Sequence, residues 1–160
     1  YADHPDLHSF PTRRSSDLTL FNRLTKAGVF AENKLFATLD TTTRRINLYG
    51  KDLILTDTVG FIRNLPHGLV EAFKATLEEA VYSDVLMIVV DSADPEREKH
   101  LATTREVLQE IGCAGIPSLV VLNKIDLVPD FKKEHAQCDF AVSSVTSEGV
   151  SEILEYFRTL

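Results

Sequence analysis

Hydrophobic residues fall in short continuous runs that alternate with longer amphipathic stretches along most of the chain. Residues 85–90 (VLMIVV) form one continuous apolar run, and residues 118–122 (SLVVL) form another. Runs this short are typical of strands covered on both faces, as in parallel sheets. Further strands are predicted at residues 46–49 and 53–56, joined at Gly50-Lys51, and at residues 140–142.

The longer stretches repeat apolar residues every three or four positions, which predicts helices. Asp94 suits a capping position and Pro95 suits a first helical turn, while Gly28 and Gly112 suit helix ends. Residues 29–43 are mostly polar and predict a loop. The helices are predicted at residues 19–27, 69–81, 95–111 and 150–157.

The order of these elements predicts one α/β domain with a mostly parallel sheet and helices on both faces. The chain has 160 residues, of which 44% are hydrophobic and 26% charged, an ordinary globular balance for one domain. The net charge of -7 argues against broad, non-specific binding of nucleic acid. A local basic contact through Arg44, Arg45 and Arg63 stays open.

The chain carries no signal for a membrane or for secretion. No apolar run approaches the roughly 20 residues needed to span a bilayer, and the N-terminus lacks a signal-peptide pattern. Cys113 and Cys138 have no metal-ligand spacing, so we expect free thiols in a reducing compartment, although one disulfide is formally possible. We therefore expect a soluble, cytoplasmic protein.

The sequence Asn123-Lys124-Ile125-Asp126 directly follows the apolar run at 118–122, and ligands of doubly wound folds bind at the carboxyl ends of strands. The carboxylate of Asp126 can accept hydrogen bonds from N1 and N2 of guanine, a pair that adenine does not offer. Asn123 can tie neighbouring loops together, and the stem of Lys124 can cover the base. The alternative is a solvated turn after a strand.

Asp57 and Gly60 follow the strand predicted at 53–56, in the sequence Asp57-Thr58-Val59-Gly60. A carboxylate there can hold the water shell of Mg²⁺, and a glycine lets its N–H approach a terminal phosphate. Thr38, in the polar loop, is a candidate magnesium ligand and γ-phosphate sensor, or else an ordinary surface threonine. Ser143 and Ser144 suit a backbone contact to guanine O6, or an ordinary loop.

Together these segments resemble the G domain of HflX, within the Obg-like translation-factor GTPases. The segments that carry the resemblance are LFATLD (residues 35–40), DTVGFIR (57–63), LPH (65–67) and AFKATLEE (72–79), and the similarity runs from Thr19 to the C-terminus.

The resemblance implies a Ras-like P-loop NTPase fold, GTP hydrolysis with Mg²⁺, and binding to the large ribosomal subunit to split or rescue ribosomes. It assigns Thr38 and Gly60 to catalysis. Phe61 stands where Ras-type enzymes have a glutamine, which implies slow intrinsic hydrolysis that a partner improves. The resemblance assigns Thr38 and Asp57 to magnesium, and assigns Asp57, Gly60, Asn123, Lys124, Asp126, Ser143 and Ser144 to the nucleotide. We also expect a monomer.

The phosphate-binding loop of such a GTPase is missing from the sequence. The motif G-x-x-x-x-G-K-[ST] would end directly before Thr19, but its last three positions hold Ser16, Asp17 and Leu18. An acidic residue in place of the lysine repels phosphate. Residues 1–10 have no strand-like run, so the first strand is missing as well, and we expect GTP to bind poorly.

Residues 8–18 back-translate to a string that resembles a common sequencing-adapter oligonucleotide. We therefore expect residues 1–18 to be non-native and residues 19–160 to be a truncated G domain. Three alternatives remain: a divergent but functional phosphate loop, a pseudo-GTPase that only binds proteins, and an ATPase, which Asp126 disfavours.

Overall fold

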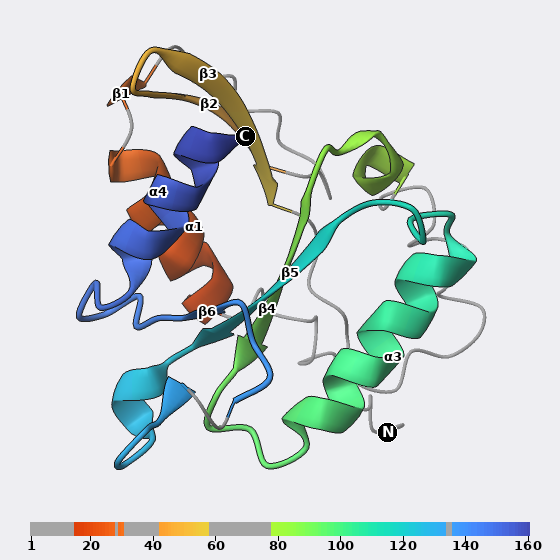
Figure 1. Ribbon diagram of the computed structural model, residues 1–160, viewed down its shortest axis with the longest axis vertical. Helices are drawn as coiled ribbons and strands as arrows, with labels where there is room; N and C mark the ends of the chain where they lie inside the picture. The colour runs from red at the N-terminus through yellow and green to blue at the C-terminus, as the bar shows by residue number, and fades with distance from the viewer. Residues whose placement is uncertain (1–14, 28, 31–41, 58–77, 134–135) are drawn as a thin grey trace, which may run out of the picture.

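The computed structural model describes residues 15–27, 29–30, 42–57, 78–133 and 136–160 (Figure 1). Thr38, Gly60 and Phe61 lie outside the described residues, as does most of the helix predicted at 69–81. The described end of that segment is a short 3-10 helix, η1 (Glu78–Tyr82).

Within the described ranges, six strands form two three-stranded sheets. The first sheet is antiparallel in the order β1-β2-β3, and the second is parallel in the order β4-β5-β6. The strands are β1 (Val29–Phe30), β2 (Thr42–Leu48), β3 (Lys51–Asp57), β4 (Leu86–Asp91), β5 (Ser118–Asn123) and β6 (Phe140–Ala141).

The β2–β3 hairpin differs from its prediction at both ends. The turn falls at Tyr49-Gly50 rather than Gly50-Lys51, with φ of 54° and 84°. Positive φ at two successive residues is the conformation that matches the twist of a tight hairpin. Strand β2 begins at Thr42, not at residue 46, because Thr42 pairs with Asp57 and extends the ladder into a polar stretch that the sequence predicts to be a loop.

The helix α1 (Ser15–Ala27) begins four residues before the predicted start at Thr19. Serine and aspartate are favoured near the start of a helix, and the sequence here is Ser15-Ser16-Asp17. Leu20 and Leu24 of α1 are each 1% exposed. Strand β1 then follows within the stretch predicted to be a loop.

The helix α3 (Arg97–Glu110) begins two residues later than predicted. Asp94 and Pro95 form the turn before the helix instead of its cap and first turn. The Asp94 carboxylate accepts the N–H of Glu96 at 3.0 Å, and the Asp94 carbonyl accepts the N–H of Arg97 at 3.2 Å. The last helix, α4 (Val150–Thr159), buries Val150, Ile153 and Phe157, as its periodicity predicted.

One core joins both sheets to α1 and α4. It contains Leu20 and Leu24 of α1, Ile46 of β2, Val121 of β5 and Ile153 of α4. A second cluster, under α3, packs Leu101 and Leu108 against the opposite face of β4 and β5. The parallel sheet therefore carries helices on both faces (Figure 1), and this part of the predicted fold is confirmed.

Arg44, one of the candidate basic contacts, is engaged by α1. Its guanidinium lies 5.3 Å from the centre of the Phe21 ring and donates to Asn22 Oδ1 and Thr25 Oγ1, each at 3.2 Å. These contacts hold β2 against α1.

Cys113 and Cys138 are both free thiols, as predicted, and Cys113 is buried. Among the described residues, no helix has the length and apolar character required to cross a bilayer.

Candidate guanine-nucleotide site

The site is built where β4 and β5 end side by side. Asp91 and Asn123 are register partners at the carboxyl ends of these parallel strands. The chain turns after each of them: Lys124 adopts a left-handed φ of 66°, and the N–H of Asp94 donates back to the Asp91 carbonyl at 3.1 Å. A side chain at either strand end therefore lies next to the loop that follows the other.

Asn123 is the hub of the site. It is 1% exposed, and its Oδ1 accepts hydrogen bonds from the N–H of Lys124 at 2.8 Å, the N–H of Ser144 at 3.1 Å and the hydroxyl of Ser144 at 2.7 Å. A single buried amide oxygen thus ties the end of β5 to the loop after β6. The structure brings together Asn123 and Ser144, which the sequence had placed in one site.

Ser92 holds Asn123 from the other side. Its hydroxyl donates to the carbonyl of Asn123 at 2.7 Å, and its N–H donates to the same oxygen at 2.8 Å. Ser92 is 2% exposed. Arg97, in the first turn of α3, donates in turn to the Ser92 carbonyl at 3.1 Å. The backbone around Asn123 is therefore fixed by the start of the neighbouring helix.

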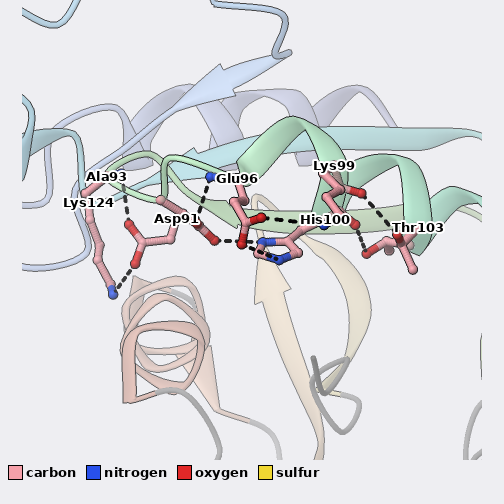
Figure 2. A network of polar contacts seen from close by, with 9 residues as sticks. Asp91, Ala93, Glu96, Lys99, His100, Thr103 and Lys124 are labelled. Carbon is pink, nitrogen blue, oxygen red and sulfur yellow. Dashed lines mark hydrogen bonds and ion pairs between the residues drawn. The ribbon is translucent and has the colours of Figure 1, made fainter. Parts of the chain in front are cut away.

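The side chain of Lys124 is anchored at its tip. Its Nζ lies 2.6 Å from Oδ2 of Asp91, while the other oxygen of Asp91 accepts the N–H of Ala93 at 3.0 Å (Figure 2). The pair is partly exposed, with side-chain exposures of 31% for Lys124 and 20% for Asp91. The lysine stem is therefore held along the site rather than left in solvent.

A second polar cluster steadies the start of α3. His100 Nδ1 lies 2.8 Å from Oδ2 of Asp94, and His100 Nε2 lies 3.9 Å from Glu96 Oε2 (Figure 2). Because Asp94 and Ser92 belong to one turn, the cluster supports the β4 side of the site. Within the described ranges, no group of three or more histidine, cysteine or carboxylate side chains is placed to hold a metal ion.

Asp126 lies in the 3-10 turn η2 (Ile125–Leu127) and is exposed. Its neighbour Ile125 is buried and donates its N–H to the carbonyl of Val142 at 3.3 Å. The turn is thus pinned by a core residue, while the carboxylate one position later reaches solvent. Two exposed acceptor oxygens on a fixed turn suit the paired N1–H and N2–H donors of guanine.

The loop after β6 is compact because of its own hydrogen bonds. Ser143 is fully buried, and its hydroxyl accepts the N–H of Thr146 at 3.1 Å. Gly149 closes the loop with a φ of 72°, and a Cβ there would meet the Ala141 carbonyl oxygen at 2.1 Å. Only glycine fits at that position.

The candidate magnesium end of the site is described only in part. Asp57 is half-buried at the last position of β3, where it pairs with Thr42. Its partners in the prediction, Thr38 and Gly60, lie outside the described residues. Asp57 and Asn123 stand on different sheets, since β3 and β4 are not paired with each other.

The structure adds residues that the sequence reasoning missed: Asp91, Ser92 and Arg23. A signal for the first two was present, because Asp91-Ser92 follows one apolar run as Asn123-Lys124 follows the next. For Arg23, whose guanidinium reaches the loop after β6, the sequence holds no comparable signal, since its partners lie 121 and 122 positions away.

Residues 19–124 match the family profile described as "50S ribosome-binding GTPase". GTPase HflX of Akkermansia muciniphila is 59% identical over 116 residues, 72% of this chain and 26% of that protein. GTPase HflX of Escherichia coli K12 is 40% identical over 161 aligned positions, 96% of this chain and 38% of that protein.

A solved structure of a GTP-binding protein from Sulfolobus solfataricus, in complex with GDP, superposes with a TM-score of 0.72 at 31% identity. It covers 91% of this chain and 49% of that one. The chain thus spans between about a quarter and two-fifths of these HflX relatives. The chain belongs to the family of 50S ribosome-binding GTPases, and its G domain is of the HflX type.

Proposed function

We propose that this chain is the guanine-nucleotide switch domain of an HflX-type GTPase that acts on the large ribosomal subunit in the cytoplasm. The observation that carries the proposal is the buried hydrogen-bonding hub at Asn123, which holds Lys124 and Ser144 beside the exposed carboxylate of Asp126. A solvated turn would not bury its asparagine or give it three donors.

The proposed roles follow the chemistry of each group. Asp126 reads the guanine edge, Lys124 covers the base, and Asn123 positions both. Ser143 and Ser144 shape the loop whose backbone meets O6. Asp57 and Thr38 would hold Mg²⁺, and the N–H of Gly60 would meet the γ-phosphate, so that loss of this phosphate releases both loops.

The ribosomal role rests on the family match and on the HflX relatives. The larger protein would bind the 50S subunit and split or rescue ribosomes, acting as a monomer. The GDP complex of the Sulfolobus solfataricus protein supports a guanine nucleotide as the ligand.

We further propose that residues 1–18 are a non-native segment and that phosphate capture is impaired. The match to the family profile begins at residue 19. Asp17 occupies the lysine position of the phosphate loop. The two sheets also separate between β3 and β4, where the first strand of a Ras-like sheet would pair with both.

Two measurements test this proposal. Titration of a fluorescent GDP analogue with Mg²⁺ into the chain is expected to give binding weaker than micromolar, and micromolar or tighter binding would refute the loss of phosphate capture. Resequencing the locus is expected to reveal a G-x-x-x-x-G-K-[ST] segment before Thr19.

The protein carrying that genomic segment is expected to bind GDP and to hydrolyse GTP faster when 50S subunits are added. If genomic DNA instead encodes residues 8–18 as they stand, the non-native segment is excluded. A protein-binding pseudo-GTPase then becomes the better description.

A further inference from the structure

Arg23 clamps the loop that follows β6 from outside. This α1 residue donates from Nε to the Ser144 carbonyl at 2.9 Å and from Nη2 to the Val145 carbonyl at 3.0 Å. A guanidinium presents its donors in a fixed planar fork, so it can hold two neighbouring carbonyls in one orientation. The contact joins α1 to the loop that follows β6.

By fixing the carbonyls of Ser144 and Val145, Arg23 also fixes the direction of the N–H groups that follow them in the chain. In a trans peptide the carbonyl of one residue and the N–H of the next point in opposite directions. The Ser144 carbonyl therefore sets the direction of the Val145 N–H. On either side of it, the N–H of Ser144 donates to Asn123 and the N–H of Thr146 donates to Ser143. The Val145 N–H lies between two donors already used inside the protein.

We propose that Arg23 is a positioning residue for guanine recognition: its fork fixes the Ser144-Val145 peptide so that the Val145 N–H meets guanine O6. The inference rests on the proposed function, and it names a specificity-determining residue outside the sequence motifs. Arg23 itself touches no nucleotide. It acts through the orientation of one peptide plane.

Guanosine is the suitable probe, because it has the base and ribose but no phosphate to be repelled by Asp17. In 6-thioguanosine a sulfur replaces O6, and sulfur is a weaker hydrogen-bond acceptor, while the N1–H and N2–H donors remain for Asp126. Both nucleosides are titrated into the 160-residue chain and followed by NMR.

Arg23→Gln is expected to weaken guanosine binding roughly fivefold and 6-thioguanosine binding less than about twofold, since one hydrogen bond to O6 is lost. Glutamine is as good a helix former as arginine, so α1 is retained. Arg23→Lys has a single ammonium that cannot hold two carbonyls in one plane, and its guanosine affinity is expected to lie between those of Arg23→Gln and the unsubstituted chain. The matched control is Arg158→Gln, an exposed arginine of α4 paired with Glu155, which should change neither affinity.

Equal weakening of both nucleosides, or of neither, would overturn the role of Arg23. The unsubstituted chain gives a second check: its Val145 amide resonance should shift on guanosine addition, and an unmoved amide at saturation contradicts the proposal. Failure of the proposed function looks different. If the unsubstituted chain binds no guanosine, the base-reading site itself is wrong. If Asp126→Asn abolishes binding while Arg23→Gln has no effect, only the Arg23 inference falls.

Discussion

Two regions of the molecule that would face one nucleotide are held in different ways. The base-reading region (residues 91–92, 123–126 and 143–146) is fixed by buried polar groups on one continuous sheet. The phosphate region consists of Asp57, which ends β3 on the other sheet, and of the sequence at 11–18, which lacks the glycines and lysine of a phosphate loop. The first region is held mainly by side chains, whereas a phosphate loop depends mainly on backbone N–H groups.

The difference shows which parts of a nucleotide site depend on each other. Asn123, Ser92 and Ser144 satisfy one another, so the base-reading region needs no ligand to keep its shape. A phosphate loop relies on backbone N–H groups wrapped around an anion, and substitution of its glycines removes that geometry. One region can therefore stay intact when the other is lost.

The largest effect, on the free energy of unfolding, is expected from removing the side chain of Asn123. Asn123→Ala removes the acceptor for three donors in a buried setting and should lower the free energy of unfolding by about 3 kcal/mol. Urea denaturation followed by circular dichroism measures this. Asn47→Ala is the matched control. On an exposed hairpin, the amide of Asn47 donates from Nδ2 to Asp52 Oδ1 and accepts the N–H of Gly50 at its own Oδ1. A loss no greater than that of Asn47→Ala would show that the base-reading region is not held as described.

The next effect concerns the phosphate region alone. Asp17→Lys replaces repulsion by attraction and should raise the affinity for GDP roughly tenfold while leaving the affinity for guanosine unchanged. Calorimetric titration of both ligands measures this. Asp84→Lys, at the opposite end of β4, makes the same charge change far from the site and should alter neither. An equal gain for guanosine would mean that the two regions are not separable.

Ser92→Ala tests the support of the hub from the β4 side. The substitution removes the hydroxyl that donates to the Asn123 carbonyl. That carbonyl still accepts the N–H of residue 92, so we expect the free energy of unfolding to fall by only about 1 kcal/mol. Ser118→Ala, at an exposed position of β5, should stay within about 0.5 kcal/mol. If both variants unfold at the same urea concentration, the Ser92 hydroxyl contributes nothing to the region.

The smallest effect is expected at Cys113, a buried thiol outside both regions. Burial raises the pKa of the Cys113 thiol above its ordinary value of 9.0. The folded state therefore holds this proton more tightly than the unfolded state. The stability it contributes is fully present below about pH 9 and is lost as the pH rises through the folded value. Cys113→Ala should flatten that alkaline decline in thermal unfolding, and an unchanged slope would contradict it.

The sequence predicted the positions of Asn123 and Asp126 better than the elements around them, for a physical reason. A buried strand and the polar residue that ends it are local signals, so Asn123 and Asp126 could be placed at a strand end. The start of β2 at Thr42 could not, because its polar residues become a strand only by pairing with β3. The Arg23 clamp joins positions 121 and 122 apart, which no local pattern encodes.

The most direct test compares guanosine with GDP, both with Mg²⁺, by calorimetric titration into the chain. If the base-reading region is intact and the phosphate region is not, GDP binds no more tightly than guanosine, since its phosphates meet no cradle and one acidic side chain. If GDP binds a hundredfold or more tightly than guanosine, the phosphates are captured and the division between the two regions is wrong.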